Sequence, residues 1–323
     1  MTSEERYYTK LKAAHLYYYD NFSQKQVADQ LNISRPTLNK LLKEARQEGM
    51  VKIEINDYRN YSNLIKLERQ LCTKFGLRDV KLVDSFIDDS AVIKERISKA
   101  AAVYFSSIIR SGMCIGVGWS RLLENMANYM TPVKSITNAE FVTLLGGSGN
   151  LDFQINANLL NEKIAKLYYN SSIHNIYAPI FASDPVLYDA LMDDKSLKRV
   201  MNKMRALDIA LIGVGGGDSS STALMTISVS KDYIKEIQEE HAIGNICARF
   251  FDINGNVCVK NLYDKTISIP LEVLKNTPTI VAMASGQDRV KPLIGAARGG
   301  YYHILITDEG TARAMLNFEN ETL

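Results

Sequence analysis

The chain has 323 residues, more than one ordinary domain of about 100–200 residues, and a hydrophobic fraction of 46% that suits a globular protein with a sizeable core. The net charge of +2 excludes a protein that is basic over its whole surface, so any contact with nucleic acid has to be local. No apolar run is long enough for a transmembrane helix, and the four cysteines form no metal-binding pattern, so we expect a cytoplasmic protein without a metal site.

The segment 23–45, SQKQVADQLNISRPTLNKLLKEA, predicts two short helices joined by a tight turn. Ser23 and Ser34 are good N-caps, Gln26 completes a capping box, and Asn32 tolerates the left-handed conformation that a sharp turn needs. A helix-turn-helix also requires a small residue where the helices approach and apolar residues late in the second helix. These demands are met by Ala28, Leu38, Leu41 and Leu42.

The outward start of the second helix carries side chains that suit DNA. Arg35, Thr37, Asn39 and Lys40 can hydrogen-bond base edges or phosphates, and recognition helices read DNA from this end. Within 32–46, four basic residues stand against one acidic residue, which gives a local charge of +3. The pattern favours a DNA-reading motif over a plain helical hairpin. A supporting helix at 11–22 and a strand at 49–55, which would form a wing, complete the predicted DNA-binding domain, 1–57.

Residues 58–77 predict a connecting helix whose apolar stripe either docks on the following domain or forms a dimer contact. From 78 to 323 short apolar runs alternate with helical segments, which predicts a doubly wound, mainly parallel α/β domain. Within it, DING at 252–255 predicts a hairpin.

Several of the predicted strands end in glycine, at 115–119, 144–150, 211–221 and 284–289. Ligands of doubly wound sheets bind at the carboxyl ends of strands, where glycine lets backbone N–H groups approach an anion. The pattern indicates a small anionic ligand such as a phosphorylated metabolite. No P-loop is present, the four histidines are scattered, and Asp308 and Glu309 suit a helix N-terminus better than an acid–base pair. We therefore predict no catalytic residues. The alternative is an enzyme of the sugar-phosphate isomerase or deaminase type with an accessory helical module.

Four segments of the chain, in order, resemble the SorC family of sugar-binding transcriptional regulators. They are FSQKQVADQLNISRPTLNKLL (22–42), IGVGW (115–119), NICARFFDINGNV (245–257) and ARGGYYHILITDEGTARAML (297–316). The resemblance runs from about residue 7 to about residue 318, and the deoxyribonucleoside-regulator branch is nearest at the N-terminus. It implies a winged helix-turn-helix, an effector domain like that of sugar-phosphate isomerases and deaminases, and a homodimer or homotetramer.

The resemblance also implies a function and a set of site residues. It implies a cytoplasmic, nucleoid-associated regulator of a carbohydrate-catabolism operon, and we expect a repressor, whose affinity for double-stranded operator DNA is controlled by a phosphorylated sugar and needs no further cofactor. The DNA-binding residues carried over by position are Gln24, Ser34, Arg35, Pro36, Thr37, Asn39 and Lys40. The effector-binding residues carried over are Gly118, Ser120, Arg121, Gly146, Gly147, Asn156, Asn245 and Arg289.

Five positions depart from the family pattern. In the family's G-W-G-x-T loop, whose hydroxyl helps to hold phosphate, Ser120 replaces the last Gly and Leu122 replaces the Thr. Asn245 stands where an Asp or Glu is expected to contact sugar hydroxyls, and Arg289 stands in place of a phosphate-binding lysine, whose role its guanidinium can still take. Leu145 stands where the deoxyribonucleoside branch has a lysine that forms a Schiff base, chemistry that leucine cannot perform.

Overall fold

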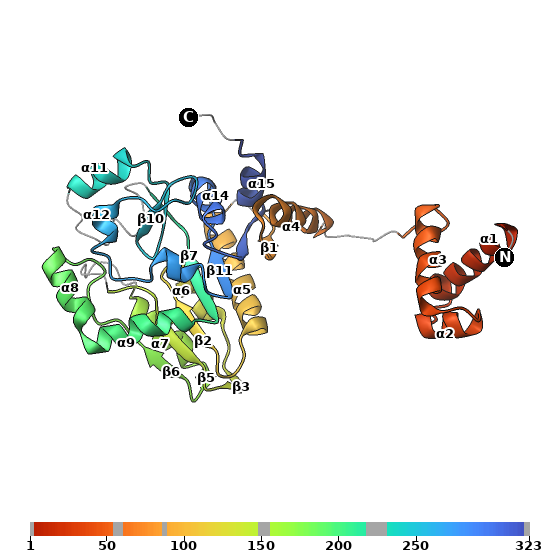
Figure 1. Ribbon diagram of the computed structural model, residues 1–323, viewed down its shortest axis with the longest axis horizontal. Coiled ribbons are helices and arrows are strands. Elements are labelled where there is room, and N and C mark those ends of the chain that lie inside the picture. Colours follow the sequence, from red (N-terminus) through yellow and green to blue (C-terminus); the bar gives the residue numbers. More distant parts are fainter. Residues whose placement is uncertain (1–2, 54–60, 86–88, 148–155, 218–230, 320–323) are drawn as a thin grey trace. The chain divides into compact units, whose positions relative to one another are not determined.

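The computed structural model describes residues 3–53, 61–85, 89–147, 156–217 and 231–319, and it divides into two compact units, Met1–Asn60 and Tyr61–Leu323 (Figure 1). The first unit is helical. Its elements are α1 (Ser3–Ala14), a π-helical turn (His15–Tyr19), α2 (Gln24–Gln30) and α3 (Arg35–Gln47).

The helix-turn-helix of the first unit forms as its capping pattern predicts. The Gln26 backbone N–H donates to Ser23 Oγ, and the Ser23 backbone N–H donates to Gln26 Oε1, so the capping box at the start of α2 is complete. Asn32 takes the left-handed conformation, with φ of 52°, in the turn before α3. The core of the unit joins side chains of all its helical segments: Ala13, Leu16, Val27, Ala28, Leu38 and Leu42.

The flanks of the motif differ from their predicted extents. The supporting helix starts earlier than residue 11, at Ser3, and ends in the π-helical turn. Of the strand predicted as a wing at 49–55, residues 49–53 form no strand, and 54–55 lie outside the described residues.

The second unit alternates strands and helices, as its sequence rhythm predicts. In chain order its elements are α4 (Tyr61–Phe75), β1 (Asp79–Val83), α5 (Ser90–Ile108), β2 (Cys114–Val117), α6 (Arg121–Tyr129), β3 (Val133–Thr137), β4 (Glu140–Thr143), α7 (Ala157–Ala165), β5 (Tyr168–Tyr169), β6 (Ser172–His174), α8 (Pro185–Asp193), α9 (Lys195–Lys203), β7 (Ile209–Gly213), β8 (Gly215–Gly216), α11 (Lys231–Glu239), β9 (Gly244–Ile246), β10 (Arg249–Phe251), α12 (Lys260–Tyr263), α13 (Leu271–Leu274), β11 (Thr279–Met283), α14 (Val290–Arg298), β12 (Ile304–Asp308) and α15 (Glu309–Asn317).

Seven strands form one parallel sheet in the order β1-β12-β11-β7-β2-β4-β6. Side chains alternate between its two faces. In β7, Ile209 and Leu211 pack with α5, α6 and α7, whereas Ala210 and Ile212 pack into the opposite core with α4, α14 and α15. Both faces are covered, which explains why the strands read as continuous apolar runs. The predicted mainly parallel α/β fold is therefore confirmed.

Two further features complete the second unit. Helix α4 docks on β1 and α15 through its buried leucines, which include Leu71, and Glu68 accepts a hydrogen bond from the Leu82 backbone N–H at 2.9 Å. The predicted hairpin is also present. DING joins β10 to Val257, which is bridged to Phe251, and a second tight turn precedes β10.

None of the helices in the described part of the chain is long and apolar enough to cross a membrane.

Candidate nucleic-acid interface and ligand cavity

The first turns of α3 present an exposed polar face. Arg35, Pro36, Asn39 and Lys40 are exposed there, and Gln24 is exposed at the start of α2. Within the described part of the chain, the side chains of Arg35, Asn39 and Lys40 make no hydrogen bond or ion pair. Their donors are therefore available to a ligand, and the positive end of the helix dipole adds to their attraction for phosphate.

Ser34 and Thr37 have a structural role on the same face. Ser34 Oγ accepts a hydrogen bond from the Thr37 backbone N–H at 3.3 Å, and the two hydroxyl oxygens lie 2.8 Å apart. Both residues are exposed, so their second hydrogen-bonding positions remain open to solvent. The pair fixes where α3 begins and hence where the polar face starts.

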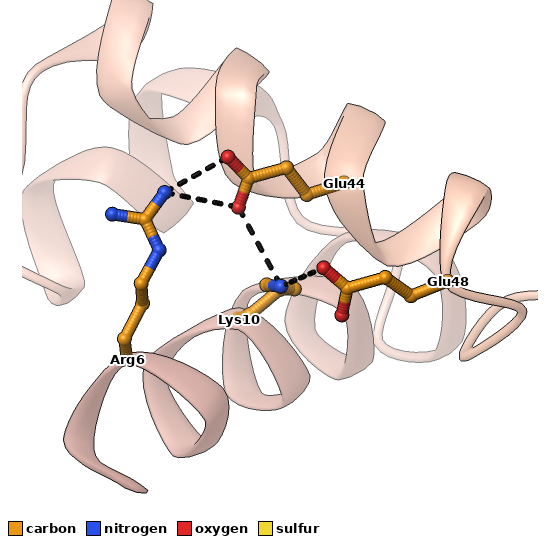
Figure 2. Close-up of polar contacts among 4 residues, drawn as sticks. All are labelled: Arg6, Lys10, Glu44 and Glu48. Carbon is orange, nitrogen blue, oxygen red and sulfur yellow. Dashed lines mark hydrogen bonds and ion pairs between the residues drawn. The ribbon is translucent and has the colours of Figure 1, made fainter. Parts of the chain in front are cut away.

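A cluster of ion pairs attaches α1 to the C-terminal half of α3 (Figure 2). Arg6 Nη2 donates to both carboxylate oxygens of Glu44, at 2.8 and 3.1 Å, and Lys10 Nζ lies between Glu44 and Glu48. The hydrogen bond to Glu48 raises the pKa of Lys10. Burial acts to raise the pKa of Glu44, but the hydrogen bond from Arg6 and the two cations outweigh it and lower that pKa. The cluster leaves the opposite, N-terminal part of α3 unobstructed.

The second unit contains a cavity of about 300 Å³ at the carboxyl ends of β2, β7 and β11. The strand order reverses between β2 and β7, because the chain continues from β2 through β4 to β6 on one side and from β7 through β11 to β12 on the other. Open α/β sheets bind ligands at this kind of topological switch point. Three of the glycine-rich strand ends line the cavity, and Leu145 contributes from the fourth.

The charged groups around the cavity favour an anion. Lys94, Arg121 and Arg289 line it, and Asp288 is the single acidic residue among the described residues of the lining. Arg289 Nη1 lies 2.9 Å from Asp288 Oδ2 but without the geometry of a hydrogen bond, so this buried donor has no hydrogen-bond partner among the described residues. Cys247 also lines the cavity, and burial raises its pKa to about 12, so its thiol stays neutral and is no nucleophile at neutral pH.

Four of the eight predicted effector-binding residues line this cavity: Ser120, Arg121, Asn245 and Arg289. Ser120 is the N-cap of α6 and accepts from the Leu123 backbone N–H at 3.1 Å. A Cβ on Gly213 would lie only 2.5 Å from Ser120 Cβ, so glycine is needed there for this loop to approach β7. Asn245 is buried, and its Nδ2 donates to the Gly216 carbonyl at 2.7 Å.

The other four predicted residues lie outside the lining. The backbone N–H groups of Gly118, Gly146 and Gly147 already donate to protein carbonyls at 2.8 to 2.9 Å, and Asn156 caps the start of α7. A Cβ on Gly146 would lie 2.7 Å from the carbonyl oxygens of Ala178 and Pro179, which gives this glycine a packing role. A contact of these four residues with a ligand stays a prediction.

The loop that carries Arg289 is held by the start of α15. Ser285 Oγ donates to Asp308 Oδ2 at 2.9 Å, and the Gly286 backbone N–H donates to Thr311 Oγ1 at 2.9 Å. Asp308 also accepts from the Thr311 backbone N–H at 2.8 Å as the N-cap of α15, while Glu309 pairs with Arg313. The TDEG segment is thus a helix cap, as preferred from the sequence.

The sequence-based selection missed Trp119 and Lys94, which both line the cavity. Trp119 had a signal, since it is the only tryptophan and stands in a glycine-rich strand end. Its Nε1 is buried without a hydrogen-bond partner in the described part of the chain. Lys94 had none, because it lies within a long helix. Within the described ranges, no group of three or more His, Cys, Asp or Glu side chains could hold a metal ion.

Comparison with known proteins identifies the family to which the chain belongs. The family model described as "Putative sugar-binding domain" matches residues 59–317. The chain belongs to the SorC family. The deoxyribonucleoside regulator of Bacillus subtilis is 31% identical, with 97% of this chain and 98% of the relative covered. The sorbitol operon regulator of Klebsiella pneumoniae is 29% identical, over 95% of this chain and 96% of the relative.

A solved structure of a SorC family member matches the chain over both of its units. The full-length sorbitol operon regulator SorC from Klebsiella pneumoniae matches 98% of this chain and 100% of its own, with a TM-score of 0.73 and 27% identity. These relatives are named as regulators, and the protein described here is accordingly a transcriptional regulator of this family and not an enzyme.

Proposed function

We propose that the chain represses a carbohydrate-catabolism operon, and that a phosphorylated sugar in the cavity changes its affinity for double-stranded operator DNA. The cationic cavity at the switch point of the sheet is the observation that carries the effector part. Lys94, Arg121 and Arg289 surround it, and the buried Nη1 of Arg289 lacks a hydrogen-bond partner among the described residues. A phosphate group supplies the acceptor oxygens that a guanidinium binds in pairs.

The volume of the cavity limits the size of the effector. About 300 Å³ corresponds to roughly ten water molecules at about 30 Å³ each. That is room for a monosaccharide phosphate. Leu145, which lines the cavity in place of the Schiff-base lysine of the deoxyribonucleoside branch, cannot bond covalently to a sugar. We therefore propose reversible, non-covalent binding, with Ser120, Arg121, Asn245 and Arg289 in contact with the ligand.

The DNA contact is proposed for the exposed start of α3 and the start of α2. Arg35, Asn39 and Lys40 have donors available to base edges or phosphates, while Ser34, Pro36 and Thr37 set the first turn against the DNA backbone and bases. Gln24 at the start of α2 would contact bases or backbone. A helix-turn-helix of this size reads one half-site, so we propose a homodimer or homotetramer that binds a two-fold symmetric operator in the cytoplasm, on the nucleoid.

Fluorescence anisotropy tests the proposal. The full chain is titrated against labelled DNA from upstream of its own operon, with excess nonspecific competitor, and the titration is repeated with phosphorylated and unphosphorylated sugars. We expect competitor-resistant binding that one sugar phosphate weakens, with a steep salt dependence from counterion release. If the sugar phosphate instead strengthens DNA binding, the sugar does not relieve repression, and the sign of the proposed control is reversed. Specific binding that no sugar shifts would refute control by a sugar phosphate. An absence of specific binding would refute the proposal that the chain regulates this operon.

A further inference from the structure

Trp119, the only tryptophan of the chain, lines the ligand cavity, and its buried Nε1 has no hydrogen-bond partner among the described residues. Trp119 directly follows the strand-end Gly118, its ring packs against the core of the second unit, and its Nε1 is buried. An indole N–H can only donate, and a buried one ordinarily finds an acceptor. No residue in the described ranges provides one.

A missing partner by itself does not indicate a ligand. Within the described part of the chain, Asn161, Tyr168 and Ser268 also have a buried polar atom without a partner, and none of the three lines the cavity. Trp119 and Arg289 differ from them because both line it, and both atoms concerned are donors. Trp119 Nε1 has no acceptor among the described residues, and Arg289 Nη1 has only an ion pair with Asp288 without hydrogen-bond geometry, so a ligand with at least two acceptor atoms would satisfy both donors.

We propose that Trp119 Nε1 donates a hydrogen bond to a hydroxyl or carbonyl oxygen of the sugar, while Arg289 binds its phosphate. This inference rests on the proposed function and deepens it, because it makes Trp119 a specificity-determining residue. A guanidinium is satisfied by phosphate alone, so Arg289 does not distinguish a sugar phosphate from inorganic phosphate. A single neutral N–H needs an acceptor on the rest of the ligand, and a ligand without that oxygen leaves the donor buried and unpaired.

The single tryptophan allows a substitution at one atom. Growth with benzothienylalanine in place of tryptophan exchanges the indole N–H of Trp119 for sulfur. No other residue changes, because the sequence contains no other tryptophan. The variant Trp119→Phe removes the same donor by mutation. Tyr168→Phe is the matched control, because it deletes another buried, unpartnered polar atom of an aromatic residue outside the cavity.

Calorimetric titration of the full-length proteins with sugar phosphates and with inorganic phosphate tests the inference. We expect the loss of the N–H to weaken binding of the effector roughly 5- to 100-fold. Binding of inorganic phosphate should change less than about twofold, and Tyr168→Phe should leave both unchanged. A deoxy analogue that lacks the accepting oxygen should lose affinity for the unmodified protein and lose no more on removal of the N–H, as in a double-mutant cycle.

The outcomes separate this inference from the proposed function. Unchanged effector affinity without the N–H overturns the role of Trp119 and leaves the phosphosugar regulator intact. Equal losses for the effector and inorganic phosphate also overturn it, because they indicate a general disturbance of the cavity. If Trp119→Phe fails to fold, the benzothienylalanine protein decides. Wild-type protein that binds no sugar phosphate overturns both proposals.

Discussion

Replacing Arg249 by methionine should destabilise the second unit by about 3–5 kcal/mol. This guanidinium is only 2% exposed. It donates four hydrogen bonds of 2.9 to 3.0 Å to backbone carbonyls, and no carboxylate balances its charge among these contacts. Nε donates to Ile269 O, Nη1 to Tyr263 O, and Nη2 to Thr266 O and Ser268 O. The residue thus holds the end of α12 at Tyr263 and the irregular segment after it, up to Ile269, in place.

The magnitude follows from opposing contributions. Hydrogen bonds to a charged group contribute about 1.5–3 kcal/mol each, so four give roughly 6–12 kcal/mol. Burying the guanidinium costs several kcal/mol, and that burial is the leading reason that the pKa of Arg249 is lowered. Methionine avoids this cost and keeps most of the volume, but it leaves four carbonyls without their donor. Four bonds worth roughly 6–12 kcal/mol, less the several kcal/mol that burial of the charge costs, leave a net loss of about 3–5 kcal/mol.

Urea denaturation followed by tryptophan fluorescence is the assay, because Trp119 is the only tryptophan and reports the second unit alone. We expect a lower midpoint with an unchanged dependence on urea. The control Arg249→Lys keeps the charge but has three donors on one nitrogen instead of a planar fork, and should also lose stability. A loss below about 1 kcal/mol for Arg249→Met, with the same urea dependence, would refute the assignment of the four bonds as a stabilising clamp.

Three further predictions concern other parts of the chain. Arg35→Ala should reduce the discrimination between operator and random DNA by about 1–3 kcal/mol, whereas Lys166→Ala, which removes an exposed charge from the second unit, should not; competition anisotropy measures both. Because the pKa of Glu44 is lowered in the folded state, the stabilisation from its ion pairs is present above the pKa of the unfolded state and is lost as the pH falls through the pKa of the folded state. An NMR titration should place the midpoint of Glu44 below that of an unpaired Glu, and Arg6→Gln should raise this midpoint. Lys74→Met should reduce the effect of the sugar on operator affinity. The affinity for the sugar without DNA and the affinity for DNA without the sugar should each change less than about twofold. An unchanged effect of the sugar would exclude coupling through Lys74.

The helix-turn-helix could be predicted because its determinants are local. Caps at Ser23 and Ser34, the left-handed Asn32 and the apolar spacing all lie within 23 residues, and each acts on its near neighbours. The parallel sheet was equally readable, since strands covered on both faces leave continuous apolar runs. The ends of these elements were less certain, as the early start of α1 at Ser3 shows.

The cavity was only half predictable, because its composition depends on strand order. Glycine after a strand fits two situations, a backbone N–H that faces a ligand and a backbone that packs against another segment. Gly146 belongs to the second, since its N–H donates to Ile267 O from a segment far along the chain. Arg249 could not be recognised either, because its four acceptors lie at the end of the short helix α12 and in the irregular segment after it, where no periodicity marks them. Such partners are set by tertiary contacts alone.

A series of contacts connects the cavity with the start of the second unit. Ser285 and Gly286 line the cavity and are hydrogen-bonded to Asp308 and Thr311 in the first turn of α15. At the other end of that helix, Lys74 of α4 donates to the Leu316 carbonyl at 2.6 Å and to those of Phe318 and Met315 at 3.3 and 3.4 Å. A cation at this position both satisfies the last carbonyls of α15 and opposes the negative end of its dipole.

The energies along this series are of the size that the proposed control of DNA binding requires. An effector changes operator affinity only as far as it binds two arrangements of the protein with different free energy. Coupling of about 1–3 kcal/mol, or roughly 5- to 150-fold in affinity, is typical. The bonds from Ser285 and from Gly286 to the start of α15 contribute about 0.5–1.5 kcal/mol each, so an anion on Arg289 that strengthened or broke both would supply that range. Because α4 packs on α15 through its leucines and Lys74, a shift of α15 would be passed to α4, the helix with which the second unit begins at Tyr61.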